Sequence, residues 1–429
     1  MEKSDFPKVL IISHNLYDDS NNIGKTLVSL FDGWPKDRLS QIYFRNDSPS
    51  FRYCDEYYCI TDKDVLKSVM SLGIKKAGSE LKKGEVLELS EAESSLYQVG
   101  NHRRPIVSFI RDVMWACGKW KTEQLRHWII NVANPDVILF APNDYTLAYR
   151  VVLYIEKTLN KPIIPFYMDD SFYYGCKTGF IDAMRRKKLR IAAKKIHGYS
   201  REIFTICEYM SREYEQIFNM QCHEFVNSVV IEDMPQKRNR GTTIFSYLGN
   251  LHSNRWKSIV EIGRMIDRIN YENKTNAILK VYSGSVLEKK VETEFEKIES
   301  LRFLGRIPAS EVREKQLESD VLIHVEAFDL ASVNSTRLSL STKIPEYLST
   351  NRMIFAYGPS NIASMRYLKD YNLAITCNSC SDLYRCLKSL LLSDANGDIS
   401  VNCYYKAVES HDIKKVSRKF QSKIREYWL

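Results

Sequence analysis

The sequence predicts an α/β protein built from two domains, each with a doubly wound parallel sheet. The chain has 429 residues, more than one ordinary hydrophobic core accommodates, so two domains of roughly 200 residues are expected. Short apolar runs alternate with segments of helical periodicity, the pattern of a parallel sheet covered by helices. Residues 233–241 are rich in Pro, Gly and charge and separate two such series, which is typical of a linker.

The first domain is expected to cover residues 1–235. Its strands are predicted from runs that are apolar throughout, as in strands buried on both faces of a parallel sheet. These runs are residues 8–13, 41–44, 56–60, 135–140, 162–168, 203–207 and 223–226. Apolar residues at helical spacing predict helices at residues 22–31, 106–120, 122–132, 145–159, 180–197 and 208–218. Residues 62–103 are polar and mixed in composition and are interpreted as an insertion.

A glycine-bearing loop joins the first strand to the first helix, as in the opening of nucleotide-binding α/β domains. The loop matches neither GxGxxG nor GxxxxGK. Two roles stay open for Gly24, namely close backbone approach to a phosphate and packing of the helix against the strand.

The second domain is expected to cover residues 241–400, and residues 401–429 form a final helical segment. Its predicted strands are residues 243–249, 277–284, 320–326 and 353–358. Its predicted helices are residues 258–269, 291–299, 309–317, 343–348 and 383–392, followed by 413–428 at the end of the chain.

The stretch LSLSTKIPEYL, residues 338–348, lies between two of these strands and has the composition of a helix start. Ser341 or Thr342 can cap the helix and Pro345 suits its first turn. Lys343 and the backbone N–H groups at such an end attract phosphate. Glu346, one turn further, can accept hydrogen bonds from a ribose diol.

The chain carries 62 Lys and Arg against 53 Asp and Glu, a formal charge of +9, which favours an anionic partner. No apolar run reaches the roughly 20 residues that span a bilayer, and the N-terminus lacks the pattern of a signal peptide. The ten cysteines are scattered, which suits reduced thiols. We therefore expect a cytoplasmic protein, and we interpret the CxxC at residues 377–380 as two incidental thiols rather than part of a zinc site.

Positive charge is concentrated in residues 180–197, where apolar residues are interspersed at helical spacing. The cations are Arg185, Arg186, Lys187, Lys188, Arg190, Lys194 and Lys195. A basic amphipathic helix of this kind can lie on an anionic membrane surface, so a peripheral location at the inner face of the membrane is expected. The alternative is a solvated face on a helix that packs on the core. Nucleic acid is not expected, because no nucleic-acid-binding motif accompanies the charge.

The segments SDVLIHVE (319–326) and LSTKIPEYLSTNRMIFAYGPSN (340–361) resemble the donor-nucleotide segment of glycosyltransferase family 4 and its relatives. These are enzymes of the GT-B architecture. The STK before the helix resembles the motif of a branch of this family whose enzymes build polysaccharides. The resemblance implies two Rossmann-like domains facing across a cleft, with the C-terminal helix crossing back to the first domain. In that arrangement the 62–103 insertion faces the acceptor side.

Under the resemblance, the helix-start glutamate binds the ribose of the sugar nucleotide, which implies that role for Glu346. The family has a further glutamate eight residues earlier, where this chain has Leu338. The family also has an arginine directly after a glycine, and this chain has Asn250 there. The diphosphate clamp is therefore assigned to Arg255, with Lys257 as substitute.

The segment LRFLGRIP, residues 301–308, is similar to a family element near the nucleotide base, which implies base or ribose contacts there. The expected donor-binding residues are Gly24, Gly249, Asn250, Lys257, Ser283, Gly284, Arg306, Ile307, Ser341, Thr342 and Glu346. Arg255 and Lys343 are expected to stabilise the charge that develops on the departing diphosphate.

Polar residues follow three strands of the first domain, and ligands of such sheets bind at the carboxyl ends of strands. One of Asp144, Asp169 and His14 is expected to orient the acceptor hydroxyl, with capping or loop roles as alternatives. Asp169 and Asp170 are adjacent and point in opposite directions if they extend a strand, so no metal site is expected.

The resemblance thus implies a retaining, metal-independent hexosyltransferase that needs no cofactor. It would move a sugar from a nucleoside diphosphate sugar to a hydroxyl of a surface-polysaccharide or lipid-linked glycan. Two alternatives remain. The first is a GT-B sugar-nucleotide epimerase, which needs the same donor pocket, and the second is a non-catalytic protein that binds a membrane surface.

Overall fold

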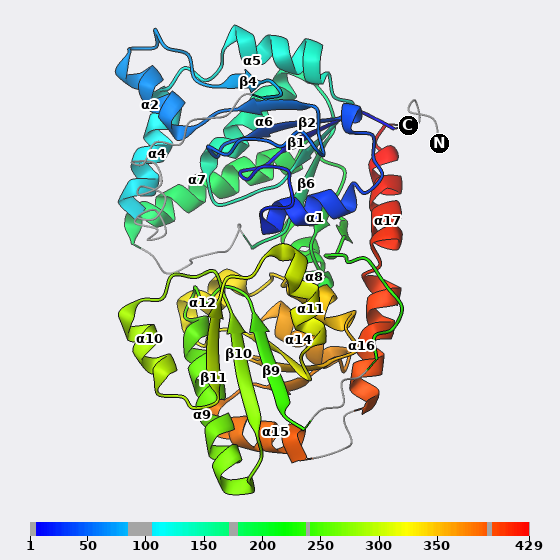
Figure 1. The fold of residues 1–429 in the computed structure, drawn as a ribbon. Coiled ribbons are helices and arrows are strands. Elements are labelled where there is room, and N and C mark those ends of the chain that lie inside the picture. Colours follow the sequence, from blue (N-terminus) through cyan, green and yellow to red (C-terminus); the bar gives the residue numbers. More distant parts are fainter. Residues whose placement is uncertain (1–5, 85–104, 171–178, 237–240, 393–396, 429) are drawn as a thin grey trace. The chain divides into compact units, whose positions relative to one another are not determined.

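The structure is a computed structural model, and it describes residues 6–84, 105–170, 179–236, 241–392 and 397–428. The chain divides into two compact units (Figure 1). The N-terminal unit contains Met1–Phe225 and Val416–Leu429, and the C-terminal unit contains Val226–Lys415. None of the described helices combines the length and apolarity needed to cross a membrane.

The N-terminal unit has a sheet in the order β4-β3-β2-β1-β5-β6-β7-β8. Its strands are β1 (Val9–Ile12), β2 (Leu39–Tyr43), β3 (Glu56–Cys59), β4 (Ser79–Leu81), β5 (Val137–Phe140), β6 (Ile163–Tyr167), β7 (Ile203–Thr205) and β8 (Cys222–Glu224). All pairings are parallel except the antiparallel edge pair of β3 and β4. The stretch 62–103 thus contributes an edge strand, and its residues 85–103 lie outside the described part.

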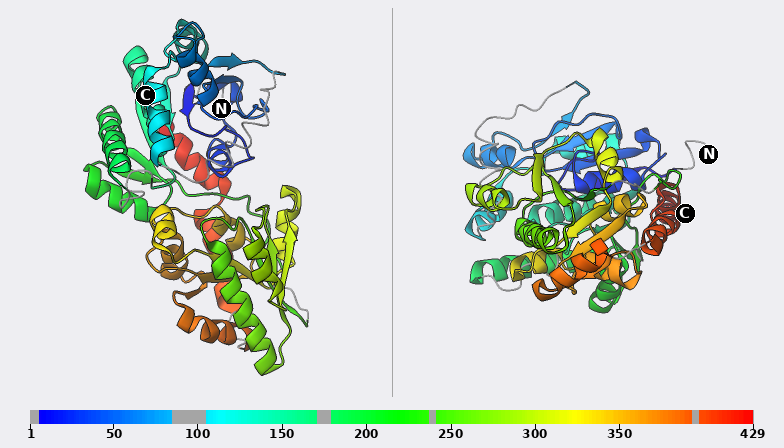
Figure 2. Two further views of the ribbon diagram at one scale, coloured as in Figure 1. Left: turned by 90° about the vertical axis from the view of Figure 1, so that its left-hand side faces the viewer. Right: turned by 60° about the horizontal axis from the view of Figure 1, so that its bottom comes forward.

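Helices cover the sheet of each unit (Figure 2). Those of the N-terminal unit are α1 (Asn22–Leu30), α2 (Asp62–Met70), α4 (Pro105–Cys117), α5 (Glu123–His127), α6 (Thr146–Leu159), α7 (Phe180–His197), α8 (Glu208–Phe218) and α17 (Ile413–Arg425). The helix α17 packs on this unit through Phe420, whose ring lies 5.1 Å from that of Phe31 and 5.1 Å from that of Phe225. The Gln421 amide also donates to the Leu30 carbonyl at 3.2 Å.

The C-terminal unit has a parallel sheet in the order β11-β10-β9-β12-β13-β14. Its strands are β9 (Thr243–Leu248), β10 (Ala277–Tyr282), β11 (Leu301–Gly305), β12 (Val321–Val325), β13 (Met353–Tyr357) and β14 (Ile375–Cys377). Its helices are α9 (Arg255–Asn273), α10 (Lys289–Glu296), α11 (Ala309–Leu317), α12 (Leu330–Thr336), α13 (Lys343–Leu348), α14 (Ala363–Asp370), α15 (Cys380–Leu392) and α16 (Gly397–Ser410). The α/β architecture with two parallel-sheet domains predicted from the sequence is confirmed.

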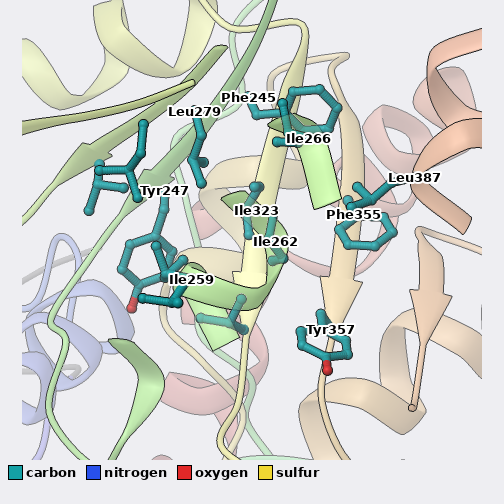
Figure 3. Packing of buried hydrophobic residues seen from close by; sticks show 14 of the residues in the cluster. Phe245, Tyr247, Ile259, Ile262, Ile266, Leu279, Ile323, Phe355, Tyr357 and Leu387 are labelled. Carbon is teal, nitrogen blue, oxygen red and sulfur yellow. The ribbon is translucent and has the colours of Figure 1, made fainter. Parts of the chain in front are cut away.

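The core of the C-terminal unit forms where α9 lies over the central strands (Figure 3). Ile259, Ile262 and Ile266 of α9 are wholly buried with Phe245 of β9 and Ile323 of β12. Burial of each such side chain contributes about 1.5–3 kcal/mol. This packing fixes the start of α9 relative to the ends of β9 and β12.

The boundary between the units lies earlier than residue 235, because residues after Phe225 are bound into the C-terminal unit. The His411 ring contacts the Asn227 carbonyl at 2.7 Å and the Tyr367 hydroxyl at 2.7 Å. Val229 pairs with Asp412 as an isolated bridge. Helix α16 is likewise part of the C-terminal unit, so only the end of the 401–429 segment packs on the N-terminal unit.

Candidate functional site

The candidate site lies at the switch point of the C-terminal sheet, where strand order reverses between β9 and β12. These two strands pair only at Val321 with Phe245 and Leu322 with Ser246. Beyond these two pairs, β9 and β12 continue to their carboxyl ends without pairing with each other. Ligands of open α/β sheets bind where neighbouring strands separate in this way. Gly249 follows β9 and Glu326 follows β12, so both border the site.

Arg255, the first residue of α9, is fixed beside Glu326. Its Nη2 lies 2.8 Å from Glu326 Oε2, and its Nη1 donates to Asn250 Oδ1 at 3.2 Å. The arginine side chain keeps 19% of its surface exposed, whereas Glu326 keeps 6%. The preceding residue, Asn254, has a φ of 59°, and its amide donates to Asp329 at 2.9 Å. The guanidinium is therefore held in place while one side stays accessible.

Lys343, the first residue of α13, reaches across to the end of β9. Its Nζ lies 4.6 Å from the centre of the Tyr247 ring, a cation–π contact. A Cβ on Gly249 would stand 1.9 Å from this Nζ. The ammonium group thus occupies the space that a side chain at residue 249 would fill, and the charge of Arg255 acts on it, so the structure brings Gly249, Lys343 and Arg255 together.

The protonation states of the site follow from its burial. Burial and the charge of Arg255 lower the pKa of Lys343 to about 8, although Glu326 and Glu346 oppose this shift. Burial, assisted by the charges of Lys343 and Arg255, lowers the pKa of His324 to about 3. Burial raises the pKa of Glu326, and Arg255 partly offsets the effect. At neutral pH Arg255 and Lys343 are therefore charged, and the His324 imidazole between them is neutral.

The predicted helix start at α13 is present, but its contacts differ from those expected. Thr342 occupies the N-cap without a side-chain hydrogen bond, and the Lys343 backbone N–H donates to Ser341 Oγ at 3.4 Å. Glu346 is half-buried and accepts a hydrogen bond from the Gln316 amide at 3.1 Å. This bond leaves a carboxylate oxygen of Glu346 for a further donor.

The remaining donor candidates fall into two groups. Ser283 and Gly284 follow β10, and a Cβ on Gly284 would stand 3.4 Å from Arg306 Cδ, so these residues are neighbours. Ser283 is buried, Arg306 is exposed and Ile307 is half-buried. Lys257 is exposed, with its Nζ 5.7 Å from the Trp256 ring centre.

The N-terminal candidates lie at the carboxyl ends of adjacent parallel strands, since β1, β5 and β6 are neighbours. The Asp144 carbonyl accepts a hydrogen bond from Arg185. Asp169 is exposed, whereas Asp170 is buried and accepts a hydrogen bond from the Tyr214 hydroxyl at 3.0 Å. Burial lowers the pKa of His14 to about 3. Within the described part of the chain, no three His, Cys, Asp or Glu side chains group around a potential metal position.

Gly24 lies at the start of α1, in the N-terminal unit, with little space around it. An added Cβ would stand 2.0 Å from the Asp18 carbonyl oxygen and 2.8 Å from Asn21 Nδ2. Asn21 caps the helix by accepting from the Gly24 N–H at 2.8 Å. The structure therefore gives Gly24 a packing role.

Two of the seven cations expected at a membrane surface are directed inward, which corrects the sequence interpretation. Arg185 is 5% exposed, and its guanidinium forms ion pairs with Asp112 at 3.3 Å and with Asp182 at 3.8 Å. Arg186 pairs with Asp182 at 2.6 Å. Arg190 is half-buried, whereas Lys187, Lys188, Lys194 and Lys195 are exposed.

Sequence reasoning missed the part that Glu326 plays at the site. Glu326 and Arg255 are 71 residues apart, so no local pattern joins them. Glu326 stands at the carboxyl end of an otherwise apolar strand. Because a buried charge needs a partner, this position indicated that a cation from elsewhere in the chain lies beside it. The neutral His324, with Nε2 3.7 Å from Glu326 Oε1, carried a similar signal.

Gly249→Ala is expected to weaken binding of a nucleoside diphosphate by up to about 10-fold without unfolding the protein, because displacing the Lys343 ammonium costs no more than a hydrogen bond to a charged group contributes, about 1.5–3 kcal/mol. The added methyl group would displace the Lys343 ammonium from its place beside Tyr247. Affinity for UDP measured by calorimetry checks the result. Gly241→Ala is the matched control, since its Cβ meets nothing within 4 Å. Equal affinities of the two variants would contradict the prediction.

Comparisons with known proteins identify the fold. No protein-family model matches the chain, and no curated protein matches it in sequence. Among solved structures, HepE of Anabaena in complex with UDP-glucose matches with a TM-score of 0.61 at 10% identity over 98% of this chain and 100% of that chain. The trehalose-6-phosphate synthase of Burkholderia multivorans matches with a TM-score of 0.60 at 11% identity over 98% and 99%. WaaG, a glycosyltransferase of lipopolysaccharide biosynthesis, matches with a TM-score of 0.57 at 10% identity over 97% and 99%. The chain therefore has the GT-B fold of these glycosyltransferases.

Proposed function

We propose that the protein is a nucleotide-sugar glycosyltransferase that acts on a surface-polysaccharide or lipid-linked glycan acceptor. One observation carries the proposal: Arg255 and Lys343 stand together beside Gly249 at the switch point of a parallel sheet. Two fixed cations in a half-buried position suit a diphosphate. The HepE structure, with its bound UDP-glucose, supports a sugar nucleotide as the ligand.

In the proposed reaction the bond between the sugar C1 and the β-phosphate oxygen breaks, and a bond from C1 to the acceptor oxygen forms. The acceptor's proton passes to the leaving phosphate oxygen, so the nucleoside diphosphate departs with it. Negative charge grows on that oxygen as the bond breaks, and Arg255 and Lys343 stabilise it. The reaction is proposed to retain the configuration at C1 and to require no metal ion, so turnover should persist in EDTA.

The other donor residues surround this centre. Glu346 is proposed to bind the ribose diol with the carboxylate oxygen that Gln316 leaves free. Arg306 and Ile307 are proposed to contact the base or its ribose. Asp144 or Asp169 is proposed to orient the acceptor hydroxyl. The reaction is placed in the cytoplasm, at the inner face of the membrane, and nucleic acid is not a proposed partner.

Incubation with UDP-, GDP- and ADP-sugars tests the proposal. Expected products are a nucleoside diphosphate in every active reaction and a glycosylated product when lipid-linked glycans from a membrane extract are added. Epimerised free sugar formed from the donor alone would favour an epimerase. Failure of all three nucleotides to bind would overturn the proposal.

Glu346→Ala is expected to reduce donor turnover by about 10- to 100-fold, because hydrogen bonds to a charged group contribute about 1.5–3 kcal/mol. The loss should shrink when the donor lacks the ribose 2′-hydroxyl, since wild-type protein loses the same contact there. Glu314→Ala is the control, because that carboxylate on α11 is 63% exposed. An identical loss with ribose and deoxyribose donors would contradict the role.

A further inference from the structure

The two segments by which the chain enters and leaves the C-terminal unit, residues 226–415, are hydrogen-bonded to each other. Near the start of the unit, the Val229 N–H donates to the His411 carbonyl at 2.8 Å. Near its end, the Ile413 N–H donates to the Val229 carbonyl at 3.0 Å. The first and last residues of the unit are therefore held in a fixed register, and a buried asparagine lies among them.

This asparagine, Asn227, is 4% exposed and bonds through both its side chain and its backbone. Its Nδ2 donates to the Leu340 carbonyl at 3.1 Å, and its own carbonyl accepts from His411 Nδ1 at 2.7 Å. Because a carbonyl oxygen only accepts hydrogen bonds, the amide nitrogen of Asn227 must face Leu340. For the same reason, the ring proton of His411 must lie on Nδ1.

His411 is held as a neutral ring in a single tautomer. Burial lowers the pKa of this wholly buried histidine to about 4. With the proton on Nδ1, its Nε2 accepts a hydrogen bond from the Tyr367 hydroxyl at 2.7 Å. Both ring nitrogens are thus bonded, and the backbone of Asn227 is fixed relative to α14 and to the end of α16.

The Leu340 carbonyl belongs to the loop that precedes α13 and lies three residues before Lys343. Thr342 occupies the N-cap of this helix without a side-chain hydrogen bond. The Lys343 N–H reaches Ser341 Oγ only at 3.4 Å, which is long for a hydrogen bond. A side-chain cap normally fixes a helix start. Here the bond from Asn227 holds the start of α13 from outside the helix.

We propose that Asn227 is a positioning residue that holds Lys343 in the diphosphate site. Its amide fixes the loop of residues 340–342, and this loop carries the first residue of α13 into the site. The Lys343 ammonium has little room to adjust, because it fills the space that a side chain at residue 249 would occupy. A shift of the loop would therefore displace the charge from the diphosphate. This inference rests on the proposed function, since it assigns a diphosphate to Lys343.

A double-mutant cycle tests the proposal, with UDP affinity measured by calorimetry. Asn227→Leu keeps about the same side-chain size and removes the donor, so it is expected to weaken UDP binding by about 3- to 10-fold, the range of one neutral hydrogen bond. In the Lys343→Ala background, the same change should alter affinity by less than about twofold, because the group that it positions is absent. Asn227→Ala removes the same donor without added bulk and should give the same pattern. Melting temperatures show whether the variants are folded.

Asn270→Ala is the matched control. Asn270 also donates to a backbone carbonyl, that of Ala277 at 2.8 Å. It lies on α9 about 22 Å from the first residue of that helix, at 1.5 Å per residue. Its loss should leave UDP affinity unchanged, whatever it costs in stability.

A second measurement needs no ligand, so it separates failure of this inference from failure of the proposed function. The pH dependence of acetylation of Lys343, followed by mass spectrometry, reports the pKa of its amine, which burial lowers to about 8. Asn227→Leu should raise this pKa towards that of an exposed lysine, and Asn270→Ala should leave it unchanged. An unchanged pKa, or equal losses of UDP affinity in both backgrounds, would overturn the inference. Wild-type protein that binds no nucleoside diphosphate would instead overturn the proposed function, and the pKa would still show whether Asn227 positions Lys343.

Discussion

Arg255→Ala is expected to slow sugar transfer by about 100- to 1,000-fold, because removal of one fixed donor from a developing oxyanion typically costs this much. The guanidinium is held ready by Glu326 at 2.8 Å and by Asn250 at 3.2 Å. A water molecule that enters the space left by the guanidinium would not be held in this fixed position, so it would not replace the lost hydrogen bonds. Single-turnover rates with saturating donor measure the effect on the chemical step.

A second variant separates the loss of catalysis from the loss of stability. Arg255→Ala leaves the buried Glu326 without its partner, and breaking a buried ion pair in this way destabilises a protein by about 3–5 kcal/mol. Arg255→Ala/Glu326→Gln removes both charges and is expected to recover much of the melting temperature while turnover stays low. Arg268→Ala, on the exposed face of the same helix with 58% exposure, should leave turnover within twofold. Recovery of turnover in the double variant would assign Arg255 a structural role only.

The positions of several strands along the chain could be predicted because parallel strands buried on both faces are apolar throughout. Residues 8–13, 135–140 and 162–168 contain β1, β5 and β6 as found. β14 escaped prediction because it has only three residues and two of them are partly exposed. Helix α12 was missed for a similar reason: seven residues with Ser, Asn and Thr show little periodicity. Its N-cap, Asp329, accepts from the Ser332 N–H at 3.1 Å and was the remaining signal.

The exact start of α9 could not be predicted from the local sequence. The sequence placed this helix at residue 258, whereas it begins at Arg255. Ser253 and Asn254 adopt left-handed conformations, with φ of 53° and 59°, and Asn254 is held by Asp329 from a distant segment. Local helix propensity therefore places the start of α9 about one turn too late. That turn is the one that carries Arg255 to Glu326.

The environment of charged side chains was the feature least predictable from the sequence. Seven cations close together in the sequence suggest a single exposed surface. The sequence does not show which of these cations form ion pairs with buried carboxylates. Arg185 does so through Asp112 on α4, and Arg186 through Asp182 on its own helix. Lys343 is the converse case, because its pairing with Tyr247 depends on a glycine 94 positions earlier in the chain, Gly249. Contacts of this kind are set by the tertiary fold, so a single sequence does not reveal them.

Lys343→Ala is expected to weaken UDP binding by about 10- to 100-fold at pH 7, since a charged hydrogen bond to phosphate contributes about 1.5–3 kcal/mol. Wild-type affinity should in addition depend on pH. The pKa of Lys343 is lowered to about 8, first by burial and then by the charge of Arg255. The protonated amine binds phosphate, so affinity is nearly constant well below pH 8 and falls above it, in total by no more than the roughly 10- to 100-fold that Lys343→Ala loses.

Burial also raises the pKa of Glu326 beside Lys343, so the pH profile needs a comparison that isolates the lysine. The pKa of His324 is about 3, and the pKa of Tyr247 is raised by burial beyond the range of the measurement. Calorimetry between pH 7 and 9 should therefore find uptake of about 0.4 to 0.8 proton on UDP binding near pH 9, because a roughly 10- to 100-fold preference of phosphate for the charged amine raises the pKa of Lys343 by about one to two units. Any titration of UDP itself is common to wild type and Lys343→Ala, so the difference between the two profiles isolates the lysine. Parallel profiles, both falling above pH 8, would show that the lysine does not contact the diphosphate.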